Sequence, residues 1–419
     1  MDYAFSTLGA ILGLAIAIIL IIKKVQPAYS LILGALVGGL IGGGGLTVTV
    51  NTMVSGASSM MSSVLRIMTS GILAGALIKT GSAEKIAETI VEKLGQKRAI
   101  LAISFATMLI CMVGVFIDIS VITVAPIAIA IGRKAGLTKG SILLAMIGGG
   151  KAGNILSPNP NTIAASEAFQ VDLTALIMEN IVPALGAFIV TVVLATMLSK
   201  KGNDAIEAVE ENKADKKLPS FVTAITGPAV VIVLLALRPL AGISIDPLIA
   251  LPIGGLISIF ATGNAKHTIA FTEFGLSKVI GVSVLLIGTG TIAGIIKASA
   301  LQYDVITIIE AMNMPAFVLA PISGILMAAA TASTTAGTTV ASQTFGTILT
   351  EANVAAVSAG AMIHAGATVL DSLPHGSFFH ATGGSVNMSI NDRMKLIPYE
   401  ACIGFTSTIL AVIWFLIIG

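Results

Sequence analysis

Long apolar runs with no charged residue recur along the whole sequence, for example Leu8–Ile22, Phe188–Leu198 and Ile409–Ile418. An α-helix needs roughly 20 mainly apolar residues to cross the bilayer core, and several runs approach that length. Only 11% of the 419 residues are charged, and the mean hydropathy is +0.99. A water-soluble protein of this size needs far more charge on its surface. The sequence therefore predicts an all-α integral membrane protein with many spans.

The apolar runs do not all have the length of a single crossing. We expect about ten full spans, each close to the length that a bilayer requires. Two further segments, 99–132 and 314–350, are each long enough for a pair of short helices and carry small and hydroxyl residues at the middle. We interpret both as re-entrant hairpins. The expected spans lie near 4–22, 27–46, 67–80, 141–165, 175–198, 219–237, 245–262, 280–297, 353–378 and 397–417.

The basic residues support this layout, because Lys and Arg collect in the cytoplasmic loops of membrane proteins. Nineteen of the 23 Lys and Arg residues fall in six alternating loops when both hairpins return to the side they started from. Both termini are then expected to be extracytoplasmic. The six loops are 23–26, 79–98, 133–140, 199–218, 263–279 and 380–396.

The two halves of the chain resemble each other. Gly71–Lys79 reads GILAGALIK and Gly290–Lys297 reads GTIAGIIK, and a shift of 216 residues places Pro158 on Pro374. The first half starts from the opposite side of the membrane to the second, so we expect an inverted repeat of the kind found in secondary transporters. The predicted units are a first repeat over 1–199, a charged cytoplasmic linker over 200–218 and an inverted second repeat over 219–419.

Two of the predicted spans contain proline in a polar setting, and we expect both to be broken helices. Ser157-Pro158-Asn159-Pro160 interrupts 141–165, and Asp371 to Gly376 interrupts 353–378. Proline lacks a backbone donor and disfavours helix at the preceding residue. Broken helix at membrane depth is tolerated where it lines a cavity, and its free ends can bind an anion or a cation.

We expect these breaks and the two hairpin tips to meet at one site for an anionic solute and a coupling cation. The predicted substrate-binding residues are Lys151, Asn154, Ser157, Asn159, Asn161, Thr162, Ser333, Thr334, Thr335, Thr338, Thr339, Ser372 and His375. The predicted coupling-ion residues are Asp118, Ser120, Asp371 and His375.

Lys151 is the one basic residue that falls deep within a predicted span. A charge inside a membrane is unfavourable by several kcal/mol unless it is paired. The lysine could bind a substrate carboxylate, pair with Asp118 or Asp371, or extend to the membrane surface. The sequence leaves these three interpretations open.

Asp118 and Asp371 are acids at predicted membrane depth. Such carboxyl groups can exchange a proton near neutral pH, and, when ionised, they can bind sodium. We favour a proton as the coupling ion, with sodium as the alternative. Three histidines within 17 residues, His364, His375 and His380, lack the spacing of zinc ligands, so we expect no metal site and no cofactor.

The motifs SPNPNT, LPHG and STTAGTT, together with AMIHAGATVLDSLPHGSFFHATGG over 361–384, resemble the gluconate permease family of the ion transporter superfamily. The resemblance covers most of the chain. It implies proton-coupled import of a small organic anion across a bacterial inner membrane. It also implies a homodimeric scaffold and a moving, elevator-type unit that contains the hairpins. The matching positions here are 118–123, 154–162, 333–339 and 371–377.

The sequence thus predicts a secondary active transporter rather than an enzyme or a nucleic-acid-binding protein. Its expected partners are the lipid bilayer and a small carboxylate. Gluconate, a shorter hydroxy acid and a di- or tricarboxylate all stay open as substrates. Besides sodium coupling, a passive anion channel is the more distant alternative.

Overall fold

A computed structural model describes residues 4–199, 217–311, 315–374 and 376–418, and it contains helices and no strand within these ranges. Of the predicted residues, His375 and most of the linker at 200–218 lie outside the described residues. The helices are α1 (Thr7–Ile22), α2 (Pro27–Ile41), α3 (Gly45–Ser58), α4 (Met61–Lys79), α5 (Ser82–Leu94), α6 (Ala99–Met112), α7 (Ile117–Lys134), α8 (Lys139–Asn154), α9 (Pro160–Phe169), α10 (Leu173–Glu179), α11 (Ile181–Ser199), α12 (Phe221–Ala241), α13 (Pro247–Ala261), α14 (Thr268–Lys297), α15 (Leu301–Ala311), α16 (Leu319–Thr331), α17 (Thr334–Glu351), α18 (Ala356–Ala367), α19 (Ser377–Ser385), α20 (Ile390–Met394) and α21 (Ile397–Ile418).

Five of the described helical segments are long and apolar enough to cross a membrane: 61–79, 181–199, 221–238, 265–297 and 390–418. A sixth is possible if the bent pair 82–94 and 96–112 forms one span. The helices α1, α2 and α13 have 15 or 16 residues and are shorter than the predicted spans. Our count of about ten full crossings therefore stays a prediction.

Helices are interrupted at both predicted breaks and near the middle of both segments in which we predicted hairpins, and the re-entrant course of these hairpins stays a prediction. Residues 155–159 separate α8 from α9, and α18 ends at Ala367, well before α19 begins at Ser377. The first hairpin turns between α6 and α7, where Gly114 has a φ of 105°. The second turns between α16 and α17, where Ala332 has a φ of 46°, and the Ser333 hydroxyl accepts a hydrogen bond from the Ala336 backbone N–H at 3.3 Å. A side-chain cap of this kind fixes where the next helix begins.

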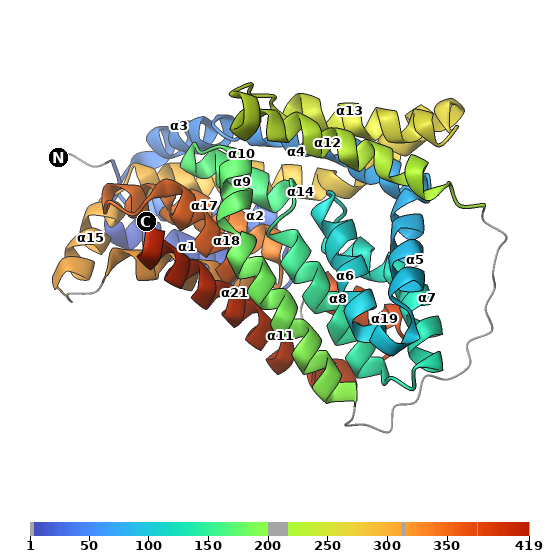
Figure 1. The fold of residues 1–419 in the computed structure, drawn as a ribbon. Helices are drawn as coiled ribbons and strands as arrows, with labels where there is room; N and C mark the ends of the chain where they lie inside the picture. The colour runs from blue at the N-terminus through green and yellow to red at the C-terminus, as the bar shows by residue number, and fades with distance from the viewer. Residues whose placement is uncertain (1–3, 200–216, 312–314, 375, 419) are drawn as a thin grey trace.

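Several helix pairs pack closely, and α12 and α13 lie side by side along the top of the view (Figure 1). Helix α1 packs on α2, and α12 packs on α13. Helix α2 also packs on α14, and α13 packs on α4. Each hairpin contacts the broken helix of the other half, because α17 packs on α9 and α7 packs on α19.

Helices α4 and α14 approach closely at glycine. A Cβ atom on Gly275 would overlap the backbone of Gly71, and one on Gly75 would overlap the backbone of Gly275, so neither helix has room for a side chain there. Helix α14 begins at Thr268, twelve residues before our predicted span at 280–297. The prediction of a loop over 263–279 is therefore wrong for 268–279, because basic and polar residues at the start of α14 hide its helical character.

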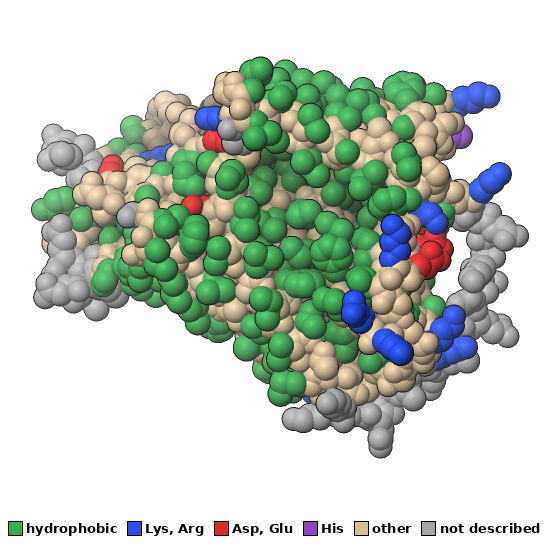
Figure 2. Space-filling model, in the orientation of Figure 1, with side chains coloured by type: hydrophobic (Ala, Val, Ile, Leu, Met, Phe, Trp, Pro, Cys, Tyr) green, Lys and Arg blue, Asp and Glu red, His purple; other side chains and the backbone are tan. Residues whose placement is uncertain are grey.

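The visible face of the molecule is mostly hydrophobic, as expected for contact with lipid (Figure 2). Lys and Arg side chains gather along its right-hand edge, where α5 and α7 lie in Figure 1, and the N-terminus lies at the other end. The large apolar side chains of Leu8, Leu240 and Ile269 are exposed.

Candidate functional site

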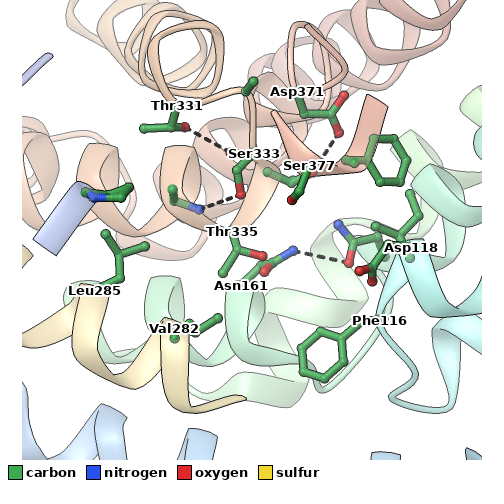
Figure 3. A pocket seen from close by; sticks show the side chains of 18 of the residues that line it. Phe116, Asp118, Asn161, Val282, Leu285, Thr331, Ser333, Thr335, Asp371 and Ser377 are labelled. Atoms are coloured by element: carbon green, nitrogen blue, oxygen red, sulfur yellow. Dashed lines mark hydrogen bonds between the residues drawn. The ribbon is translucent and has the colours of Figure 1, made fainter. Parts of the chain in front are cut away.

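A cavity of about 400 Å³ lies where the two hairpin tips and the two helix breaks meet (Figure 3). Its wall includes Asp118 after the first hairpin tip, Thr334 after the second, and Asn154 and Asp371 at the two breaks. Segments that are far apart in the sequence thus contribute to one site. Helix α14 and the start of α2 complete the wall.

Five helices begin at this cavity. Its lining includes Pro27 of α2, Ile117 of α7, Asn161 of α9, Thr334 of α17 and Ser377 of α19, each the first or second residue of its helix. The backbone N–H groups of a first helical turn have no partner within the helix, and the helix dipole makes that end positive. The cavity is therefore built to favour a negatively charged group.

The Asp371 carboxylate interacts with three side chains, and Asp371 is part of the cavity wall. Its Oδ1 lies 2.7 Å from the Lys151 Nζ and accepts a hydrogen bond from the Ser372 hydroxyl at 2.9 Å. The Thr334 hydroxyl donates to Oδ2 at 2.6 Å, which ties the second hairpin tip to the second break.

Lys151 is paired inside the protein rather than free to bind a ligand. Its ammonium also donates to the carbonyl oxygen of Thr368 at 2.5 Å, and its side chain is 1% exposed. It does not line the cavity. Of the three interpretations that the sequence left open, the structure shows the ion pair with Asp371.

Asp118 lies in the first turn of α7 and faces the cavity (Figure 3). Its Oδ1 accepts a hydrogen bond from the Ile119 backbone N–H at 2.9 Å. No basic side chain of the described residues forms an ion pair with this carboxylate. Asp118 and Asp371 thus face one cavity. Among the described residues Asp371 forms an ion pair with Lys151, whereas Asp118 has the Lys278 ammonium within electrostatic range but forms no ion pair.

Three asparagines hold the first break together. Asn159 caps α9, because its Oδ1 accepts from the backbone N–H groups of Asn161 at 2.9 Å and Thr162 at 3.2 Å. The Asn159 side-chain amide in turn donates to the Asn154 Oδ1 at 2.6 Å, and the Asn161 amide donates to the same oxygen at 3.2 Å. Asn159 therefore lies behind the wall and shapes it, whereas Asn154 and Asn161 line the cavity.

The structure brings seven of the predicted residues to the cavity wall and leaves others behind it. The lining residues are Asp118, Asn154, Asn161, Ser333, Thr334, Thr335 and Asp371. The described residues that do not line it are Ser120, Lys151, Ser157, Asn159, Thr162, Thr338, Thr339 and Ser372. The hydroxyl groups of Ser157, Thr338 and Thr339 are buried without a hydrogen-bond partner in the described structure.

One part of the wall was not predicted from the sequence. Lys278, Gly281, Val282 and Leu285 of α14 line the cavity. Their spacing places them on one face of the helix, which was the available signal. We missed it because Lys278 lies in the segment that we interpreted as a loop.

The family model and the relatives that match this chain are all described as permeases or transporters. A family model described as "GntP family permease" matches residues 5–418. A protein of Haemophilus influenzae named "Uncharacterized transporter" is 53% identical over 410 residues, which is 98% of each chain. The "High-affinity gluconate transporter" of Escherichia coli is 23% identical over 303 residues, 67% of this chain and 69% of that protein.

Among solved structures, the fold is similar to that of the YdaH transporter of Alcanivorax borkumensis. The TM-score is 0.67, and the alignment covers 97% of this chain and 98% of that one. The sequence identity is 13%, so this likeness concerns the fold alone.

Proposed function

The chain belongs to the GntP permease family, and from that premise we propose that it imports a small organic anion by proton symport. It is a transporter of this family, and its hydrophobic helices agree with a multi-pass protein of a bacterial inner membrane. Gluconate, which a relative's name gives as that protein's substrate, is the first ligand to test.

The observation that carries this proposal is the set of helix N-termini around the cavity. The first residues of α7, α9, α17 and α19 come from both hairpins and both breaks, and they direct their positive ends at one volume. A carboxylate is the natural ligand there, and the side-chain amides and hydroxyls of Asn161, Ser333 and Thr335 can bind the hydroxyl groups of a hydroxy acid.

Asp118 is the group that we propose for the coupling ion. It faces the cavity, and no described residue forms an ion pair with it, whereas Asp371 is neutralised by Lys151. A carboxylate in such a place can take up a proton or bind sodium when the anion enters. We favour the proton, and sodium is the alternative.

We further propose that the two halves form an inverted repeat, and that a unit with both hairpins moves in an elevator-type step. The matching contacts of α1 with α2 and α12 with α13 support the repeat. The crosswise packing of α17 on α9 and α7 on α19 makes the hairpins and breaks one packed body. The basic edge in Figure 2 supports a cytoplasmic face there and extracytoplasmic termini. A homodimer is the proposed assembly.

Uptake of labelled gluconate into proteoliposomes tests the function. We expect accumulation under a proton gradient and none under a sodium gradient alone. The reverse result would replace the proton by sodium. Counterflow, in which unlabelled gluconate inside drives entry of the label, separates a carrier from a passive channel. Absence of both accumulation and counterflow, together with absence of binding, would contradict the proposed substrate.

A further inference from the structure

The charges that line the cavity do not include Lys151, which was one of the candidate anion ligands in the sequence. Lys151 is buried behind the wall and is bound to Asp371 and to the Thr368 carbonyl oxygen. Moving it to a substrate would leave the Asp371 carboxylate buried without its cation, which is strongly unfavourable. A substrate carboxylate bound near the helix N-termini therefore needs a different basic side chain as its partner.

Lys278 is the one basic side chain among the described residues that line the cavity. It is exposed, and no described carboxylate forms an ion pair with it. Its ammonium lies 4.9 Å from the centre of the Phe274 ring, and it interacts electrostatically, without forming an ion pair, with the Asp118 carboxylate in the wall of the same cavity. A cation–π contact with an exposed lysine is weak and leaves the three N–H donors available to a ligand.

The surroundings of Lys278 are suited to a bound molecule. Gly281, one turn further along α14, has nothing within 4 Å of the position where a Cβ atom would lie, so the wall is open there. Val282 and Leu285 continue the same face as an apolar surface (Figure 3). The hairpin hydroxyls line the same cavity from other helices, so a ligand with an acidic end and a hydroxylated chain can contact both Lys278 and these hydroxyls.

We propose that Lys278 is the side chain that binds the carboxylate of the substrate. This inference rests on the proposed function, because it assigns a partner to the anion of that same cavity. Lys278 belongs to α14, which packs mainly against α4, α3 and α2 and to a lesser extent against α17, whereas the hydroxyl and amide ligands belong to the hairpins and breaks. The substrate is thus held between α14 and the hairpins and breaks, and α14 provides the side chain that recognises its charge.

The test compares an anion with a neutral molecule of almost the same shape. Binding of gluconate and of gluconamide to the purified full-length protein is measured by calorimetry, for the wild type and for Lys278→Gln and Lys278→Arg. We expect the glutamine variant to lose about tenfold or more in affinity for gluconate, because it removes a charge-assisted hydrogen bond, and to change little for gluconamide. The arginine variant should retain most of the preference for the anion.

Lys79 offers a matched control. Its ammonium lies 4.1 Å from the centre of the same Phe274 ring, but Lys79 does not line the cavity. Lys79→Gln should leave both affinities unchanged. An unchanged gluconate affinity in Lys278→Gln would overturn the assignment, and so would an equal loss for gluconate and gluconamide, which indicates a damaged wall. If the wild type binds neither gluconate nor gluconamide, the proposed function itself is contradicted. This outcome is distinguishable from failure of the Lys278 assignment, in which the wild type still binds gluconate.

If Lys278→Gln does not fold, a chemical rescue decides the matter. Lys278→Cys is made together with Cys402→Ser, since Cys402 is exposed and Cys111 is buried. A methanethiosulfonate reagent that adds an aminoethyl group should restore the preference for gluconate. The corresponding uncharged methyl reagent should not, and equal effects of the two reagents would overturn the proposal.

Discussion

The Lys151 ammonium lies 2.7 Å from the Asp371 carboxylate, and both side chains are almost completely buried, at 1% and 2% exposure. The pair joins α8 to the break after α18, and Thr334 adds the tip of the second hairpin to the same carboxylate. One ion pair therefore connects the first half of the chain to the two interrupted elements of the second.

Lys151→Ala should destabilise the protein rather than simply weaken ligand binding. The substitution leaves a buried carboxylate without its cation, and loss of one partner of such a pair reduces stability by about 3–5 kcal/mol. The measurement is thermal unfolding in detergent. Lys151→Met combined with Asp371→Leu should recover part of the loss, because it removes both charges together. A Lys151→Ala protein as stable as the wild type would show that the pair does not hold the fold.

Thr334→Val should weaken the attachment of the second hairpin tip. It removes the hydroxyl that donates to Asp371 Oδ2 at 2.6 Å while keeping the shape of the side chain. A hydrogen bond to a charged group contributes about 1.5–3 kcal/mol, and stability should fall by an amount of that order. Thr350→Val, at the exposed far end of the same helix, is the control. Equal effects of the two substitutions would argue against a special role for the tip.

Asp118→Asn should separate exchange from gradient-driven uptake. The amide keeps the size of the side chain and can still accept a hydrogen bond from the Ile119 N–H, but it no longer titrates or carries charge. We expect counterflow of gluconate to persist and accumulation under a proton gradient to be lost. Full accumulation by this variant would remove Asp118 from the coupling mechanism.

Asp246 makes stability depend on pH through Arg66. The Arg66 Nη2 lies 2.6 Å from Asp246 Oδ2, and this hydrogen-bonded contact lowers the pKa of Asp246 below its ordinary value. Because the folded pKa is the lower one, the stabilisation is present above the ordinary aspartate pKa and disappears as the pH falls through the folded pKa.

Asp246→Asn isolates this charge, because an asparagine can still cap α13 by accepting from the Leu248 N–H. Asp246 is 38% exposed, so solvent screens the pair, and we expect a loss of about 0.2–1 kcal/mol at neutral pH. The difference from the wild type should vanish in acid. Thermal unfolding over a pH series measures it, and a difference that persists at low pH would contradict the assignment.

Gly275→Ala should loosen the crossing of α4 and α14. The new methyl group would overlap backbone atoms of Gly71, and overpacking of this kind reduces stability by about 1–3 kcal/mol. Gly281→Ala in the same helix is the control, because open space surrounds that position. Alanine favours helix over glycine, so the control should be neutral or slightly stabilising in thermal unfolding. A destabilised control with an unaffected Gly275→Ala would overturn this description of the crossing.

The sequence by itself determined that the helices fold in a lipid environment, and it determined where several of them end. Apolar runs require helices in lipid, because each backbone polar group must then bond within its own segment. The interruptions at Pro158 and Pro374 and the cap at Ser333 are local effects of proline and of short polar side chains, and these can be predicted without tertiary contacts.

Only the tertiary structure decided which charges meet. From the sequence, Lys151 could bind a substrate, form an internal ion pair or extend to the membrane surface. The packing of α8 against the second break places it in an ion pair with Asp371, 220 residues away. Lys278 was hidden at the start of a helix whose polar residues were typical of a loop, and the packing of α14 placed it at the cavity. Local preferences act within a few residues along the chain, whereas ion pairs and cavity walls depend on distances between distant segments. Those distances follow from how all the helices pack together.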